Sequence, residues 1–136
     1  MSKYTSITTD IFSVFSSNDW LAESIKTFPD NFVGTSIGNE YIRVNMLFGE
    51  NNPSNSLISV SGQLMIDIFT ESGQGPNRFA TIADKLDHYL VGKSFNLSND
   101  GTTQLGSSNL QSFGIDKDNS SLHRALYTIP FDFYGV

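Results

Sequence analysis

The sequence predicts a single α+β domain in which an antiparallel β-sheet with a long hairpin is packed on one face by two helices. Two observations indicate the hairpin: residues 40–48 and 57–70 both alternate apolar and polar side chains with a strand's period of two. A third observation indicates the helices, because residues 5–16 and 77–90 repeat apolar side chains at helical spacing. At 136 residues the chain suffices for one domain, which normally buries about two-thirds of its unfolded surface.

The first helix is expected over residues 5–16, with Thr5 or Ser6 as its cap and Asp10 in its early turns. Its apolar stripe consists of Ile7, Ile11, Val14 and Phe15. A turn follows at 16–19, and residues 20–25 fit either a short helix or a strand. Pro29 ends that stretch, because it removes a backbone donor and biases Phe28 away from helix.

The two long strands are predicted to form an antiparallel hairpin closed by a polar loop over 49–56. The apolar residues of each strand share one face. They are Ile42, Val44, Met46 and Phe48 in the first strand, and Ile58, Val60, Leu64, Ile66 and Ile68 in the second. Gly62, in mid-strand, predicts a bulge or a close approach of another backbone. Asp67 interrupts the apolar strand, and we expect it on the face turned away from the core.

The second helix has the cleaner pattern of the two. Pro76 suits its first turn, where a missing N–H costs nothing, and Gly92 is placed to end it. The apolar positions between them are Phe79, Ile82, Ala83, Leu86, Tyr89 and Leu90.

The rest of the chain is less regular until its end. Residues 94–121 are rich in Ser, Asn, Gly and Asp, with one or two strands expected over 102–113 and an exposed turn over 114–121. Residues 122–134 alternate again and predict a closing strand. Pro130 within it indicates an edge strand or a bulge.

Composition excludes several classes of protein. The chain has no Cys, so it holds neither disulfides nor thiolate metal sites. The formal net charge of −6 argues against a sequence-reading DNA binder. No apolar run reaches the length of a membrane span or a signal peptide, so we expect a soluble protein made in the cytoplasm.

No candidate for catalysis survives inspection. Gly34-Thr35-Ser36-Ile37-Gly38 matches G-x-S-x-G, but a strand rather than the required helix is expected next. His88 and His123 have no partner at metal-ligand spacing, and 116–119 lacks the Gly and Glu of a calcium loop. We therefore expect no enzyme, no cofactor and no metal.

One resemblance emerges from the order of the segments. Glu40–Val44 and Leu47–Glu50 are followed by Ser61–Phe69, then Gly73-Gln74-Gly75, a helix with Ile82-Ala83-Asp84, and Leu90–Lys93. With residues 29–32 before them and 127–131 after, these segments resemble the tail terminator (tail-completion, head-tail joining) proteins of long-tailed bacteriophages. The resemblance covers about residues 20–134 and is one of order and spacing.

The resemblance implies a structural virion protein of the tail or neck. Such a protomer closes into a ring, typically a hexamer, on the tail tube protein, stops tube growth and meets a head-side connector or stopper protein. Genomic DNA would pass through the lumen without specific binding, with which the acidic balance is compatible.

Apolar side chains on both faces near the end of the second hairpin strand indicate that a neighbour covers one of them. We expect the hairpin and the 71–76 break to carry subunit or tube contacts. The candidate contact residues are Asp67, Phe69, Glu71, Gly73, Gly75 and Pro76. The alternatives are another tail or neck component, such as a tube protein or connector adaptor, and a small binding module or hydrolase.

Overall fold

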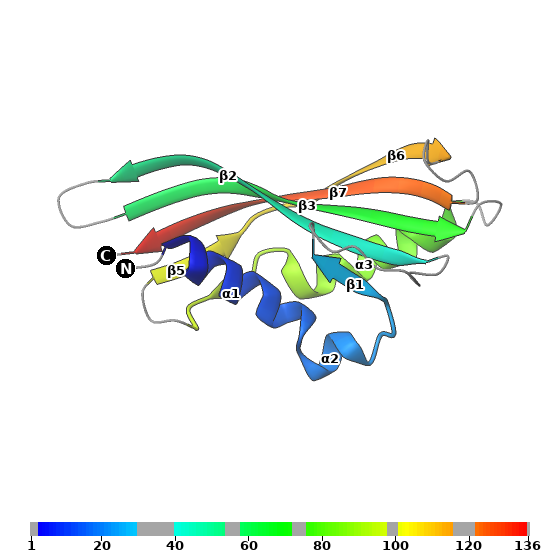
Figure 1. Ribbon diagram of the computed structural model, residues 1–136, viewed down its shortest axis with the longest axis horizontal. Helices are drawn as coiled ribbons and strands as arrows, with labels where there is room; N and C mark the ends of the chain where they lie inside the picture. Colours follow the sequence, from blue (N-terminus) through cyan, green and yellow to red (C-terminus); the bar gives the residue numbers. More distant parts are fainter. Residues whose placement is uncertain are drawn as a thin grey trace.

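A computed structural model describes residues 3–29, 40–53, 58–71, 76–97, 101–115 and 122–135. It confirms the α+β class: a curled, mostly antiparallel sheet carries its helices on one face (Figure 1). The strands are β1 (Thr27–Pro29), β2 (Tyr41–Pro53), β3 (Ile58–Glu71), β4 (Ser94–Phe95), β5 (Gly101–Leu105), β6 (Asn109–Ile115) and β7 (Leu122–Gly135). The helices are α1 (Lys3–Phe15), α2 (Asn18–Leu21) and α3 (Asn77–Leu90).

Three long strands form the centre of the sheet, whose order is β1-β2-β3-β7-β5-β4. The β2–β3 hairpin is confirmed, and β7 pairs with the whole of β3, from Ile58 opposite Gly135 to Glu71 opposite Leu122. On its other side β7 pairs with β5 along one half and with β6 along the other. The short edge strand β1 pairs with β2 in parallel, whereas the other pairs of described strands are antiparallel.

Both predicted helices are present, and the open choice for residues 20–25 resolves at its start into the last residues of α2. The Ser17 hydroxyl caps α2 by accepting a hydrogen bond from the Trp20 N–H at 3.3 Å. Helix α3 has the predicted bounds, with Pro76 before it and Gly92 after it at a φ of 69°. That positive φ explains why glycine ends the helix.

The loop predicted over 49–56 starts too early, since β2 continues to Pro53. Its pairing with β3 shifts register between Phe48 and Asn51, so Gly49 and Glu50 form an irregularity inside the strand. The polar composition of residues 49–53 predicted a loop. The prediction was wrong because a bulged strand accommodates the same residue types. Residues 54–57 lie outside the described part of the chain.

Gly62 confirms the predicted close approach. A Cβ at this position would collide with the backbone oxygen of Leu47 and would lie 2.6 Å from Cζ of Phe131. The ring of Phe131 therefore occupies the space that a side chain at 62 would need.

Pro130 corrects the prediction of an edge strand or bulge. It lies in the central strand β7, between the residues that pair with β5 and those that pair with β6. Its carbonyl accepts a hydrogen bond from Gly106 N–H at 3.0 Å, so the side of Pro130 that lacks a donor faces the junction between the two partner strands. No ladder bond is lost there, which is why proline is tolerated in the centre of a sheet.

The core lies between the sheet and its helices. Helix α1 contributes Ile7 and Ile11, α3 contributes Ile82 and Leu86, and all four are fully buried. Burying each such side chain contributes about 1.5–3 kcal/mol before the entropic cost.

A buried carboxylate fastens the weakly patterned region to α1. Asp10 is fully buried, and its two oxygens accept hydrogen bonds from Leu97 N–H at 3.0 Å and Thr103 Oγ1 at 2.8 Å. These bonds hold the segment around β4 and β5 against α1. The one or two strands expected over 102–113 are β5 and β6, which together extend from 101 to 115. Residues 116–121, predicted as an exposed turn, lie outside the described residues.

Candidate functional site

The face of the sheet away from the helices is the candidate functional site, and we call it the open face (Figure 1). It displays the alternate residues of the three long strands, whose neighbours in sequence point into the core. From β2 these are Tyr41, Arg43, Asn45 and Leu47, from β3 Ser61, Gln63, Met65, Asp67, Phe69 and Glu71, and from β7 Leu122, Arg124, Leu126, Thr128, Asp132 and Tyr134.

One end of the open face carries a second, smaller apolar cluster. The rings of Tyr41 and Phe69 stack with centroids 4.6 Å apart, and Phe28 meets Tyr41 edge-on at 5.8 Å. Leu122 completes the cluster, and Tyr41, Phe69 and Leu122 are all buried. Stacked and edge-on aromatic pairs of this kind stabilise beyond the area that they bury.

A buried ion pair lies beside this cluster. Asp67 is 8% exposed, and its Oδ1 accepts hydrogen bonds from Nε and Nη2 of Arg124 at 2.9 and 2.6 Å. Its Oδ2 accepts a third from Asn45 Nδ2 at 3.3 Å. Arg124 also lies 5.1 Å from the ring centroid of Phe113 on β6. Each oxygen of this buried carboxylate therefore accepts at least one hydrogen bond from within the chain, and Arg124 balances its charge.

The predicted contact residues divide into three groups. Asp67 and Phe69 lie together on the open face as expected, although both are buried. Glu71 is exposed at the end of β3, and Pro76 is exposed at the start of α3. Gly73 and Gly75 lie outside the described residues. Sequence reasoning missed Tyr41, Arg43 and Arg124, whose only signal was an aromatic or charged residue on the polar side of an alternating strand.

Strand β6 forms an exposed edge beside the open face. Every residue of β6 is exposed except the half-buried Gly114, and β7 is the one partner of β6 within the described residues. Three of its side chains are large and apolar: Leu110, Phe113 and Ile115. The strand contains no charged residue and no proline, the usual protections of an edge against pairing with another chain.

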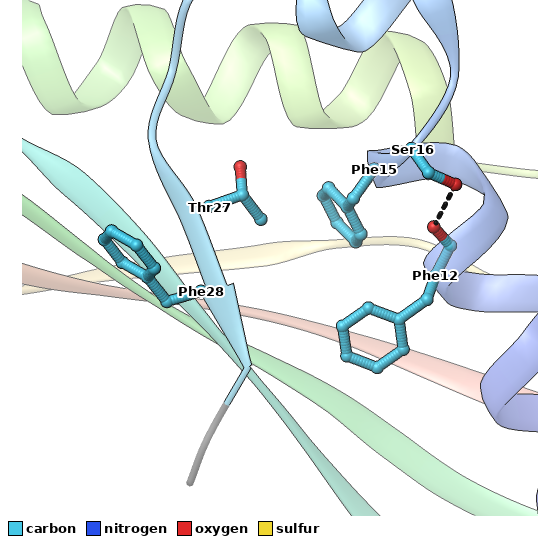
Figure 2. A pocket seen from close by; sticks show the side chains of 5 residues that line it. All are labelled: Phe12, Phe15, Ser16, Thr27 and Phe28. Atoms are coloured by element: carbon cyan, nitrogen blue, oxygen red, sulfur yellow. Dashed lines mark hydrogen bonds between the residues drawn. The ribbon is translucent and has the colours of Figure 1, made fainter. Parts of the chain in front are cut away.

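A pocket of about 490 Å³ opens between α1 and β1. Figure 2 shows its lining of three aromatic rings, Phe12, Phe15 and Phe28, with Ser16 and Thr27. Both hydroxyls are already engaged: Ser16 donates to the Phe12 carbonyl at 3.1 Å, and Thr27 accepts from Trp20 Nε1 at 2.9 Å. None of the described lining residues is titratable, so they offer apolar contact rather than chemistry.

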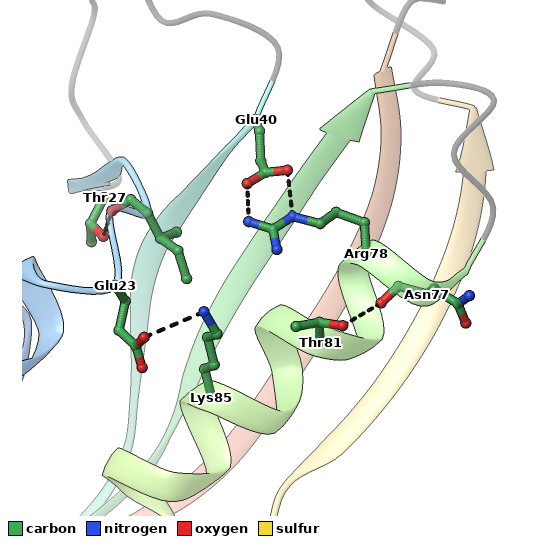
Figure 3. A network of polar contacts seen from close by, with 8 residues as sticks. Glu23, Thr27, Glu40, Asn77, Arg78, Thr81 and Lys85 are labelled. Carbon is green, nitrogen blue, oxygen red and sulfur yellow. Dashed lines mark hydrogen bonds and ion pairs between the residues drawn. The ribbon is translucent and has the colours of Figure 1, made fainter.

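Ion pairs tie α3 to the rest of the fold (Figure 3). Arg78 donates two hydrogen bonds to the Glu40 carboxylate, from Nε at 2.7 Å and from Nη2 at 2.5 Å. Lys85 Nζ lies 3.3 Å from Glu23 Oε1. The hydrogen bonds from Arg78 hold the pKa of the Glu40 carboxyl below its usual value. These pairs orient α3 on the sheet.

Further along α3, Asp87 accepts hydrogen bonds from Ser108 at 2.6 Å and from the Tyr127 hydroxyl at 2.7 Å. Burial, together with the bond to Asp87, raises the pKa of the Tyr127 hydroxyl. The hydroxyl therefore remains a donor, and the contact is a structural link between α3 and β7.

One arrangement has part of the geometry of a hydrolase. Ser112 Oγ and His123 Nε2 lie 3.2 Å apart, and the imidazole stacks on Phe79 at 4.9 Å. The other ring nitrogen, Nδ1, is buried without a hydrogen-bond partner. A serine nucleophile needs a base whose second nitrogen is oriented by a third group. The residues that the structure describes supply no such group.

The described residues contain no group of three His, Cys, Asp or Glu side chains able to hold a metal ion. No described helix is long and apolar enough to cross a membrane.

Comparison with known proteins identifies the fold but no family. No family model matches the chain, and no curated protein matches it in sequence. A chain from the "virion of native gene transfer agent (GTA) particle" has a similar structure, with a TM-score of 0.76, 13% identity, and coverage of 98% of both chains. Another solved chain, whose name describes no function, has a TM-score of 0.74 at 13% identity and covers 96% of this chain and 94% of its own. At this identity the likeness establishes a shared fold.

Proposed function

We propose that this protein is a structural component of a phage-like virion, and specifically a tail terminator. In this role it caps the tail tube, stops tube growth and forms the tail-side joint for the head. The observation that carries the proposal is the match, over nearly the whole of both chains, to a chain of a gene transfer agent virion. The order of strand pair, glycine break and helix, found in the sequence, points to the same class.

The surface of the molecule supports an assembling protein. A closed ring needs two different patches on each protomer, one for each neighbour. The open face and the uncharged edge of β6 are surfaces of the kind that subunits use. The proposed partners are further copies of this chain in a ring, which the resemblance implies to be a hexamer, the tail tube protein, and a head-side connector or stopper.

The charge of the chain is compatible with a channel for DNA. With fourteen acidic and eight basic residues, the chain has a net negative charge, which opposes binding to a phosphate backbone. Genomic DNA would then pass without being held. We place the protein in the tail or neck of the particle.

We also propose that the protein is not an enzyme. Among the described residues, none orients the imidazole of the Ser112–His123 contact, and none that lines the apolar pocket is titratable. Ser36, the serine of the G-x-S-x-G match, lies outside the described residues. An esterase assay comparing the wild type with Ser36→Ala and Ser112→Ala tests this point, since a turnover lost in either variant would contradict it.

Polymerisation in vitro separates a terminator from a tube protein. Electron microscopy of the purified protein at rising concentration should show single rings or unassembled protomers, but no long tubes. Added to polymerising tail tube protein, it should shorten the tubes in proportion to its concentration. Long tubes formed by this protein alone would favour the tube-protein alternative. Tubes of unchanged length would contradict the terminator role.

A further inference from the structure

Arg43, on the open face, has no acceptor for its buried Nε among the described residues. Its Nε is buried and has no hydrogen-bond partner, and Arg43 forms no ion pair with any residue that the structure describes. A buried donor that is left unsatisfied costs stability, so each instance calls for an explanation.

The nearest acid does not provide one. Asp67 is the direct cross-strand partner of Arg43, a position from which opposite charges normally pair. Its Oδ1 nevertheless accepts two hydrogen bonds from Arg124, and its Oδ2 accepts one from Asn45. The acid opposite Arg43 therefore forms its ion pair with Arg124 instead.

Aromatic rings hold the unpaired guanidinium in place. Its Cζ lies 5.9 Å from the ring centroid of Tyr41 and 5.8 Å from that of Phe69, and both rings are buried. These distances are near the limit of about 6 Å for a cation–π contact, so the attraction is weak. The contact positions the side chain more than it compensates the missing acceptor.

We infer that Arg43 is the anchor of a subunit interface, and that it binds a carboxylate on a second copy of this chain. Arginine, with tryptophan and tyrosine, is enriched among the residues that contribute most to protein interfaces, and its guanidinium can form two parallel bonds to one carboxylate. A carboxylate that draws the guanidinium outward would give its donors an acceptor. This inference rests on the ring assembly of the proposed function.

The charges of the chain favour a second copy as the partner. It has six more acidic than basic residues, and Arg78, Lys85 and Arg124 are committed to acids of their own chain. Exposed acids such as Glu71 and Asp84 form no ion pair within the described residues. Nucleic acid is the less favoured ligand, because one arginine beside Asp67 does not make the broad basic surface that a phosphate backbone needs.

The test is sedimentation of the purified protein over a range of concentrations. Arg43→Met keeps the length and the apolar packing of the side chain but removes its charge and donors. The matched control is Lys93→Gln, which removes one positive charge from an exposed side chain. We expect the wild type and Lys93→Gln to associate alike, and Arg43→Met to associate at least about tenfold more weakly, the effect of losing one interface anchor.

Thermal unfolding of the dilute protomer distinguishes an interface role from a structural one. We expect the Arg43→Met protomer to melt at the same temperature as the wild type or higher, because the unsatisfied donor is gone. A lower melting temperature together with unchanged association would overturn the inference.

Three other outcomes would also overturn it: equal association of Arg43→Met and wild type, a wild type that stays monomeric at every concentration, or duplex DNA binding that Arg43→Met alone abolishes. None of these bears on the virion role, which the behaviour of phage lacking the gene decides separately.

Discussion

The two faces of the sheet are built from the same three strands but follow different chemistry. On the helix side, Ile66 and Ile68 of β3 are fully buried and belong to the main apolar core. One position away, Asp67 and Phe69 are almost as buried, yet they lie among arginines on a face without helices. Burial on the helix side forms the apolar core, whereas burial on the open face lies beside charged side chains, and we propose that this second face is the contact surface.

The largest difference should appear when the same side chain is truncated on each face. Leu64 is fully buried on the helix side, and Leu47 is 58% exposed on the open side of the adjacent strand. We expect Leu64→Ala to lower the free energy of unfolding by about 2–5 kcal/mol through the cavity that it leaves. Leu47→Ala should change it by less than about 0.5 kcal/mol. Urea unfolding of both variants measures this, and similar losses would contradict the division into two faces.

A smaller loss is expected from filling space on the helix side. In Gly62→Ala the new methyl group would meet the Leu47 backbone and the Phe131 ring. The strands must then shift, at a cost of about 1–3 kcal/mol. Gly106→Ala is a suitable control, because its Cβ would come no closer than 3.2 Å to Pro130. If Gly62→Ala is as stable as that control, the close approach at Gly62 is not real.

On the open face, the ion pair between Asp67 and Arg124 should contribute to the free energy of unfolding. Arg124→Met leaves the Asp67 carboxylate buried with Asn45 as its remaining described donor. We expect a loss of about 2 kcal/mol, below that of a fully buried pair because Arg124 is 39% exposed. The double variant Asp67→Asn/Arg124→Met should recover part of the loss, as a double-mutant cycle by chemical denaturation would reveal. Additive losses would show that the two side chains do not interact.

The smallest effect concerns the half-exposed pair of Glu40 and Arg78. Because the Glu40 pKa is lower in the folded protein, the pair stabilises above the usual carboxyl pKa near 4.5 and loses its contribution as the pH falls through the lowered value. Glu40→Gln should therefore cost about 0.5 kcal/mol at neutral pH, and the difference from wild type should vanish in acid. Thermal unfolding between pH 7 and pH 3 measures it, and a pH-independent difference would exclude the ion pair as its source.

The helix side of the fold could be predicted from sequence because its signals are local. The alternation in β3 and the helical spacing in α3 depend on residues a few positions apart, and both elements have nearly the predicted bounds. Pro130 and residues 49–53 were misjudged because their roles depend on which strand lies beside them. Local composition does not contain that information.

The open face was largely unpredictable for the same reason. Asp67 was singled out as an interruption of an apolar strand, but its partner Arg124 lies 57 residues away. The strand register places Arg43 opposite Asp67, whose carboxylate is paired with Arg124. The missing acceptor of Arg43 can be recognised only from this register. Long-range pairing decided the chemistry of this face.

The measurement that tests the central claim most directly is electron microscopy of lysates from a phage that lacks this gene. The account predicts DNA-filled heads beside separate tails of irregular and excessive length, because nothing stops the tube or joins it to the head. Normal, joined virions would contradict a virion role of any essential kind. A complete absence of tails would contradict the terminator role and favour a component needed to build the tube.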